Sequence, residues 1–291
     1  MSDKFAVVTV SSDDFALGSA VALASFRQSN RWFSGETVVI ATDLSDDRRA
    51  LIRAAGPTEF RAPSNELLRR IDALCDARPE LRTRRLRFCS LESFALAGYD
   101  KVLFLDSDTV VSGDFEELFR RPEPFIAAPD KPTLIGKRRD RTSFESVDAN
   151  EQAGLASFNA GMMLIGHDLL DGTVYADLLD LLEPDAWKGV KTDHTDQLVL
   201  NRRLAPQTML VAPLYNLPIG HRIAAQLLQG RSVEEVCMFH FNGPRKPWKP
   251  DHIVERAIDD PVVGCALAKW HRAFERMVAE ARLGRLATSA G

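Results

Sequence analysis

Short apolar runs alternate with longer amphipathic stretches along most of the chain. The runs have the length of buried strands, and the stretches place apolar residues on one helical face. The predicted strands are Phe5–Val10, Thr37–Ala41, Lys101–Leu105, Phe125–Ala128, Met162–Ile165, Thr208–Ala212 and Val236–Phe241. The predicted helices are Ser19–Gln28, Asp46–Ala55, Asn65–Ala77, Leu81–Ala97, Leu169–Leu182, Thr195–Arg203 and Ile223–Gln229. This alternation predicts an α/β fold with a mixed, mostly parallel central sheet flanked by helices, in which ligands bind at the carboxyl ends of strands.

Two segments depart from this alternation. Residues 131–156 are polar and charged, and we expect a long surface loop beside the site, either a mobile lid or an insertion without a role. After Pro250, apolar residues recur at helical spacing over Ala266–Leu286, which predicts a helix packed on the domain. The expected organisation is a main domain over residues 1–250 and a helical tail over residues 251–291. Weak peripheral contact of this tail with a membrane surface is the alternative.

Charge and composition narrow the function. The chain has 41 acidic and 37 basic residues, a balance that argues against binding along a nucleic-acid backbone. The first residues show no secretory signal, and no apolar run reaches the roughly 18 residues that span a membrane. We therefore expect a cytoplasmic protein, or one that lies peripherally at the inner face of the membrane. The cysteines, predicted to be free buried thiols, are Cys75, Cys89, Cys237 and Cys265.

Two aspartates, Asp106 and Asp108, close the predicted strand Lys101–Leu105. Side chains two residues apart in a regular strand share a face, and two buried like charges are tolerable when they hold a divalent cation. Carboxylate oxygens suit magnesium or manganese. The segment fits two enzyme classes. One is a phosphatase of haloacid dehalogenase type, with Asp106 as nucleophile, and the other is a glycosyltransferase whose DxD motif holds the cation on a nucleotide diphosphate.

Position and downstream segments favour the glycosyltransferase. About a hundred residues of α/β sequence precede Asp106, whereas the phosphatase motif normally lies on the first strand of its core. Further along, Phe158–Ile165 places an asparagine and a glycine at the start of a strand, and Asp196-Gln197 opens a helix. His240 and Lys246 follow the last predicted strand. A histidine beside a carboxylate pair can complete a metal site, and a lysine can neutralise a phosphate.

Together these segments resemble the family 8 glycosyltransferases. The matching pieces occur in the family's order over roughly residues 5 to 250: Val7–Ser11 with Phe15, Leu103–Thr109, Phe158–Gly161, Asp196-Gln197 with Asn201, and His240–Gly243 with Lys246–Trp248. The resemblance implies that residues 1–250 form a catalytic domain with the GT-A fold, a Rossmann-like nucleotide-diphospho-sugar transferase fold. It also implies a UDP-sugar donor, with UDP-glucose or UDP-galactose favoured, and Mn²⁺ or Mg²⁺ as cofactor.

The resemblance also implies roles for individual residues. The metal ligands would be Asp106, Asp108 and His240. The nucleotide and donor sugar would be bound by Thr9, Val10, Ser11, Phe15, Arg85, Ser107, Asp130, Gly243 and Lys246. The catalytic residues at the reacting sugar would be Asp196, Gln197 and Asn159. Phe15 departs from the family pattern, where a tyrosine often stacks on uracil, so stacking survives but a phenol hydrogen bond is lost. For Asp196, a carboxylate that stabilises a helix N-terminus is the competing interpretation.

The family retains the anomeric configuration of the transferred sugar, so the resemblance implies a retaining hexosyltransferase. We favour front-face attack by the acceptor hydroxyl, because the sequence shows no certain nucleophile of the paired-carboxylate kind. The alternatives are the phosphatase and a catalytically silent protein that binds a UDP-sugar. The sequence leaves the acceptor open among a glycan, a lipid-linked acceptor, a protein and a small molecule, and it also leaves a homodimer open.

Overall fold

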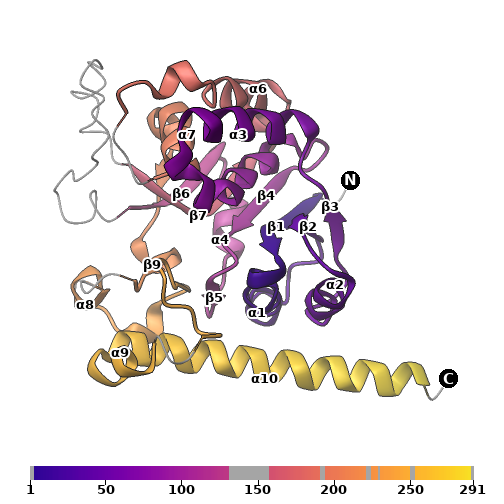
Figure 1. The fold of residues 1–291 in the computed structure, drawn as a ribbon. Helices are drawn as coiled ribbons and strands as arrows, with labels where there is room; N and C mark the ends of the chain where they lie inside the picture. The colour runs from indigo at the N-terminus through magenta and orange to yellow at the C-terminus, as the bar shows by residue number, and fades with distance from the viewer. Residues whose placement is uncertain are drawn as a thin grey trace.

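The computed structural model describes residues 3–130, 157–190, 194–220, 224–228, 230–249 and 253–289. Its centre is a seven-stranded sheet of order β3-β2-β1-β4-β7-β6-β8, and a three-stranded sheet has the order β5-β10-β9 (Figure 1). The strands are β1 (Phe5–Ser12), β2 (Glu36–Asp43), β3 (Glu59–Arg61), β4 (Lys101–Leu105), β5 (Thr109–Val111), β6 (Phe125–Pro129), β7 (Phe158–Gly166), β8 (Met209–Leu210), β9 (Leu217–Pro218) and β10 (Met238–His240). The α-helices are α1 (Ala16–Ser29), α2 (Asp46–Arg53), α3 (Asn65–Ala77), α4 (Glu116–Arg120), α6 (Thr173–Asp180), α7 (Asp196–Leu204), α8 (Ala224–Leu227), α9 (Val254–Asp259) and α10 (Pro261–Ser289).

The central strands of the large sheet are buried on both faces, because their apolar residues alternate between two hydrophobic clusters. On β1, Val7 faces one cluster, while Ala6 and Val8 face the other. On β4, Leu103 belongs to the first cluster and Phe104 to the second. This arrangement explains why both strands read as continuous apolar runs in the sequence.

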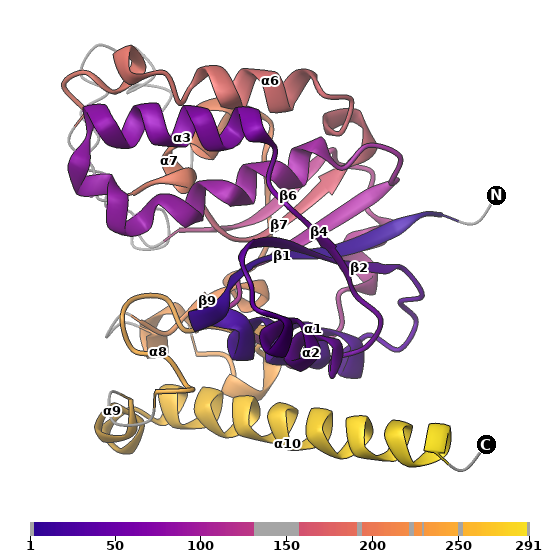
Figure 2. The same cartoon turned by 45° about the vertical axis from the view of Figure 1, so that its right-hand side comes forward.

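Helices cover both faces of the large sheet (Figures 1 and 2). On one face, α3, α6 and α7 pack together with a run of 3₁₀ turns, Pro79–Ala95, over the second cluster. On the other face, α1 and α2 contribute to the first cluster. The long helix α10 packs along the outside of α1. The sheet is therefore a middle layer whose strand ends remain available for a site.

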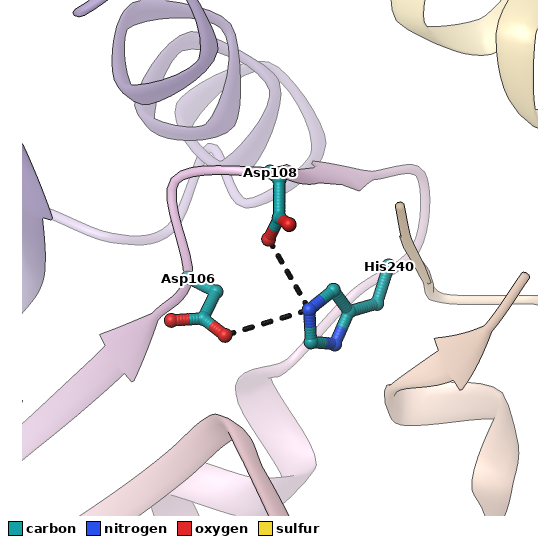
Figure 3. Close-up of side chains that lie close together, drawn as sticks. All are labelled: Asp106, Asp108 and His240. Atoms are coloured by element: carbon teal, nitrogen blue, oxygen red, sulfur yellow. Dashed lines mark ion pairs between the residues drawn. The ribbon is translucent and has the colours of Figure 1, made fainter. Parts of the chain in front are cut away.

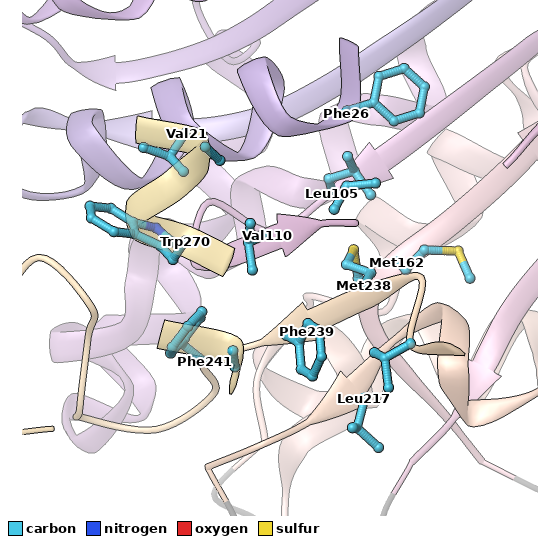
Figure 4. Packing of buried hydrophobic residues seen from close by; sticks show 14 of the residues in the cluster. Val21, Phe26, Leu105, Val110, Met162, Leu217, Met238, Phe239, Phe241 and Trp270 are labelled. Carbon is cyan, nitrogen blue, oxygen red and sulfur yellow. The ribbon is translucent and has the colours of Figure 1, made fainter. Parts of the chain in front are cut away.

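The small sheet begins directly after the carboxyl end of β4. Strand β5 follows β4 after the turn 106–108, and β10 pairs antiparallel with β5 and parallel with β9. Figure 4 shows Val110 and Phe239 of this sheet in one cluster with Val21 of α1 and Trp270 of α10. This packing brings the end of β10 close to the end of β4, although the two strands are far apart in the chain.

The sheet has the predicted mixture of strand directions but contains one strand, β3, that was not predicted. Strand β7 runs antiparallel to both β4 and β6, so the sheet is mixed and mostly parallel, as predicted. Strand β3 lies between α2 and α3, where the sequence predicted two helices in succession. Its three residues are half-buried or exposed, so they leave no apolar run to recognise.

Two predicted helices are also different in the structure. The segment predicted as a helix over Leu81–Ala97 forms 3₁₀ turns instead. Its buried residues Phe88, Leu91 and Phe94 recur every third position, which matches the three residues per turn of a 3₁₀ helix. The helix predicted over Leu169–Leu182 is shorter, because α6 starts only at Thr173, after a glycine with φ of +90°.

The C-terminal segment is helical, as predicted. Helix α10 buries Val263, Trp270 and Met277 in the same cluster as α1, whereas the domain boundary at residue 250 and a membrane contact stay predictions. Among the described residues, no helix combines the length and the apolar composition needed to cross a membrane. All four cysteines fall within the described residues and are free thiols. Cys75 and Cys89 are buried as predicted, but Cys237 and Cys265 are only half-buried. The predicted loop 131–156 lies outside the described residues.

Candidate functional site

The aspartate pair lies on the turn that joins the two sheets. Asp106 follows β4 and Asp108 precedes β5, so the expectation that they share a face of one regular strand is wrong. The N–H of Asp106 donates to the carbonyl oxygen of Gly161 on β7 at 3.0 Å. The N–H of Phe241 donates to the backbone carbonyl oxygen of Asp108 at 2.8 Å. The turn is thus held by β7 on one side and by the residue after β10 on the other.

His240 completes the cluster from the end of β10, where it lies opposite Thr109 of β5. Its Nε2 is 3.4 Å from Oδ2 of Asp106 and 3.2 Å from Oδ1 of Asp108 (Figure 3). The three candidate ligand atoms all lie within 4.8 Å of one another. Two carboxylate oxygens and one imidazole nitrogen that converge in this way fit a divalent cation such as Mg²⁺ or Mn²⁺ and leave further coordination positions free.

Lys246 adds a positive charge beside this cluster. Its buried ammonium group forms an ion pair with Oδ2 of Asp108 and donates to the carbonyl oxygen of Phe241 at 2.9 Å. The two oxygens of Asp108 are therefore divided, because Oδ1 faces His240 and Oδ2 faces the lysine. A phosphate that approached the cluster would meet this lysine.

The charges in the cluster shift the three pKa values in different directions. Desolvation and then the charge of Asp108 raise the pKa of Asp106 to about 7. Burial alone would raise the pKa of Asp108, but His240 and Lys246 lower it below its usual range. Burial alone would lower the pKa of His240, but the two aspartates raise it. A cation bound beside Asp106 would favour its ionised form and so oppose the rise in its pKa.

The carboxyl end of β1 carries three of the residues predicted to bind the nucleotide. Thr9 and Ser11 are buried, and Val10 is half-buried. Ser11 Oγ accepts a hydrogen bond of 2.8 Å from Ser19 on α1, whereas Thr9 Oγ1 has no partner among the described residues. The buried hydroxyl of Thr9 therefore needs a hydrogen-bond partner, which a ligand at the end of β1 could supply.

Phe15 links the end of β1 to the carboxylate cluster. Its ring is 36% exposed and stands edge-on to Trp248, with the ring centroids 5.7 Å apart. The Lys246 Nζ lies 5.9 Å from the centroid of Phe15. Trp248 also packs closely against α1, because a Cβ added at Gly18 would lie 2.5 Å from its indole ring. The aromatic pair and the cluster therefore border the same site.

An amide network joins the predicted sugar-binding residues. Asp130 Oδ2 accepts hydrogen bonds from Ser157 Oγ at 2.7 Å and from Gln197 Nε2 at 3.4 Å. Gln197 Oε1 accepts from Asn159 Nδ2 at 3.1 Å, and Asn159 Oδ1 accepts from the N–H of Gly161 at 2.9 Å. The structure thus brings together Asp130, Asn159 and Gln197, which the sequence placed at the donor sugar.

Asp196 is the first residue of α7. Its Oδ2 accepts from Ser90 Oγ at 2.8 Å, and its Oδ1 accepts from Thr195 Oγ1 at 2.9 Å. Its charge also contributes to the raised pKa of Asp106, so it lies within electrostatic reach of the cluster. The geometry is therefore compatible with both roles that the sequence allows for Asp196, a catalytic group at the reacting sugar and a carboxylate that stabilises the N-terminus of a helix.

The remaining predicted residues differ in how closely they join the site. Arg85 forms an ion pair with Asp72 on α3, so its role at the donor stays a prediction. Ser107 lies within the turn, with its carbonyl group against Gly18 of α1. Gly243 follows β10 with φ of +91°, a conformation that favours glycine.

Sequence reasoning missed three residues of this region. Arg87 has a charge that counteracts the rise in the pKa of Asp106, and Ser90 donates to Asp196. Asn216 is fully buried, contacts His240 Nδ1 through its Oδ1 at 3.0 Å, and donates from Nδ2 to Asn159 Oδ1 at 2.9 Å. The sequence marks Asn216 only as a polar residue between two apolar ones.

Comparisons with known proteins agree with this geometry. The sequence profile described as glycosyl transferase family 8 matches residues 6–252. Among curated proteins of Streptococcus pneumoniae serotype 4 (strain ATCC BAA-334 / TIGR4), the glycosyltransferase GlyE is 28% identical over 158 residues, and the glycosyltransferase GlyD is 26% identical over 159. Each alignment covers 51% of this chain, but only 34% of GlyE and 17% of GlyD.

Solved structures share the fold. The galactosyltransferase LgtC, in complex with donor and acceptor sugar analogs, matches with a TM-score of 0.66 and 19% identity over 95% of both chains. The crystal structure of GlyE from S. pneumoniae TIGR4 matches with a TM-score of 0.59 and 22% identity, over 84% of this chain and 57% of that one. At such identities the match shows the GT-A glycosyltransferase fold, as the sequence predicted.

Proposed function

Because this chain belongs to glycosyl transferase family 8, we propose that it transfers a hexose from a UDP-sugar to an acceptor hydroxyl with retention of anomeric configuration. The observation that carries this proposal is the convergence of Asp106, Asp108 and His240 within 4.8 Å, with Lys246 paired to Asp108. This arrangement offers a cation site and a lysine side by side, which is what a diphosphate leaving group needs.

Asp106, Asp108 and His240 would hold Mn²⁺ or Mg²⁺, and their donor set fits either ion. The bound cation would offset the charge that develops on the departing UDP. Lys246 lies where it would exchange part of its contact with Asp108 for a phosphate oxygen. The backbone of Gly243, in the exposed turn after β10, would assist at the same diphosphate.

The uridine would bind at the end of β1. Thr9 and Ser11 supply hydroxyls there, and the hydroxyl of Thr9 is still without a partner among the described residues. The partly exposed ring of Phe15 would stack on uracil, with Trp248 behind it as a support. Ser107, between the two aspartates, would contact the ribose through its backbone.

The donor sugar would lie along the amide network, where Asp130, Asn159 and Gln197 are already linked by hydrogen bonds. Groups that bind several hydroxyls at once can select one hexose among its epimers. Asp196 and Gln197 would stabilise the oxocarbenium-like state during front-face attack, in which the departing phosphate accepts the proton of the acceptor hydroxyl.

Two alternatives make different predictions. A phosphatase would cleave simple phosphate esters without a nucleotide, and the family match does not support it. A silent binding protein would respond to UDP but release no product. The donor is proposed to carry glucose or galactose, and galactose gains some support because LgtC, a galactosyltransferase, shares this fold. The acceptor is left to experiment.

A nucleotide screen with a turnover assay tests the proposal. We expect UDP with Mn²⁺ to raise the melting temperature, whereas ADP or GDP with Mn²⁺ should raise it much less. UDP should be released slowly from UDP-galactose or UDP-glucose, and NMR of the glycosylated product should show a retained anomeric configuration. Stabilisation by UDP without any release would favour the silent protein. No response to UDP, or an inverted product, would contradict the proposed reaction.

A further inference from the structure

The buried side-chain amide of Asn216 connects His240 to Asn159 on β7. Asn216 lies directly before β9, which pairs with β10 so that Pro218 is opposite His240. Its Oδ1 lies 3.0 Å from Nδ1 of the imidazole. We propose that Asn216 is a positioning residue that fixes the tautomer and the orientation of His240, so that Nε2 presents its electron pair to a divalent cation. This inference rests on the proposed function, because it assumes that His240 binds the cation.

The orientation of the Asn216 amide follows from a fixed backbone donor. The N–H of Gly161 is 2.9 Å from a side-chain atom of Asn159, and an N–H group can only donate, so that atom is the carbonyl oxygen. The same oxygen is 2.9 Å from the Asn216 amide, which must therefore turn its NH₂ group toward it. The Oδ1 of Asn216 is then the atom that faces His240.

This orientation determines which imidazole nitrogen carries hydrogen. A carbonyl oxygen can only accept, so Nδ1 of His240 must be the donor to Asn216. In the neutral imidazole the other nitrogen, Nε2, then has no hydrogen and keeps its electron pair. Figure 3 shows Nε2 turned toward Asp106 and Asp108, with the second ring nitrogen on the far side. Three electron-rich atoms therefore converge, as a cation requires.

The ring has little freedom to adopt another orientation. A ring turned by half a rotation would place a carbon against Oδ1 of Asn216 and lose the only polar contact that the described residues make with Nδ1. The imidazole also packs against Gly161 so closely that a Cβ there would lie 2.5 Å from Nδ1. Partners of this kind orient metal-bound histidines, and their removal typically weakens metal binding about 10- to 100-fold.

Metal affinity in an Asn216→Leu variant tests the inference. Mn²⁺ binding is followed by the electron paramagnetic resonance signal of the free ion, in the presence of saturating UDP. We expect the dissociation constant of the variant to rise about 10- to 100-fold. Asn201→Leu is the matched control, because the Asn201 amide also bonds β7, through the N–H and the carbonyl oxygen of Phe158, and within the described part of the chain it forms no hydrogen bond with His240. Its dissociation constant should stay within about threefold of wild type.

A second measurement needs no variant and reports the tautomer directly. In the ¹⁵N-labelled wild-type protein saturated with UDP and Mg²⁺, heteronuclear NMR should show hydrogen on Nδ1 of His240 and none on Nε2. Hydrogen on Nε2 in that state would overturn the inference, as would an Asn216→Leu variant that binds Mn²⁺ as tightly as wild type. A wild-type protein that binds no Mn²⁺ would instead refute the proposed function, and the positioning role would fall with it.

Discussion

Replacement of Gly161 by alanine tests how tightly the cluster is built. The new Cβ would lie 2.5 Å from Nδ1 of His240 and 2.9 Å from Oδ1 of Asn159, whereas ordinary contacts of a Cβ begin at 3.4 Å. The imidazole or the strand must therefore move by about 1 Å, since a packed interior has no spare volume. A shift of about 1 Å at a reaction centre can cost about 100-fold in rate, and overpacking destabilises a protein by about 1–3 kcal/mol.

We expect Gly161→Ala to weaken Mn²⁺ binding at least about 10-fold and to lower turnover further, while the protein still folds. Titration of Mn²⁺ in the presence of UDP measures the first effect, and urea denaturation measures the loss of stability. Gly284→Ala is the control, because a Cβ at that position of α10 would meet no atom of the described residues within 4 Å apart from the neighbouring backbone of its own helix. It should keep its metal affinity and gain up to about 1 kcal/mol, since alanine favours a helix over glycine. Wild-type Mn²⁺ affinity in Gly161→Ala would refute the packing argument.

Three further predictions concern the same site. Asp108→Asn should abolish metal-dependent turnover of a UDP-sugar without unfolding the protein, and full activity in that variant would refute the metal role. The Mn²⁺ affinity should increase from about pH 6 to about pH 8, because the pKa of Asp106 is raised to about 7 and the pKa of His240 is also raised, so that protons compete with the cation on the acidic side. Calorimetric titrations across that range measure the effect, and a flat profile would contradict it. Trp248→Ala should destabilise the protein by about 2–4 kcal/mol in urea denaturation, because the indole fills the space against Gly18. It should also reduce the thermal shift caused by UDP, because the indole supports the ring of Phe15. An unchanged thermal shift with UDP would contradict that support.

The sequence predicts the elements whose signals are local. Helix α3 occupies Asn65–Ala77 as predicted, because Ser64 caps it by accepting from the N–H of Leu67 and its apolar residues keep helical spacing. Strand β4 also has the predicted bounds, since a five-residue apolar run between polar residues leaves few alternatives. The motif residues around these elements could likewise be found, because their types and order resemble those of one family.

The remaining features depend on contacts between distant parts of the chain. Strands β5 and β9 have three and two residues, and they exist because β10 pairs with both. The two aspartates come close to His240 because of that pairing. The alternation of side chains along residues 101–108 therefore could not predict their approach. Asn216 is equally inaccessible to local reasoning, because its function depends on residues of β7 and β10.

The turn between the two sheets also has a consequence for how the protein folds. Lys246 and Asp108 are separated by 138 residues, and their ion pair forms only when β10 has reached β5. Closing so long a loop has a large entropic cost before any contact compensates for it, which makes such pairings slow. We therefore expect the cation site to assemble late in folding. In a refolding experiment, the signal of bound Mn²⁺ should develop with the last cooperative phase, after most of the helical structure has formed.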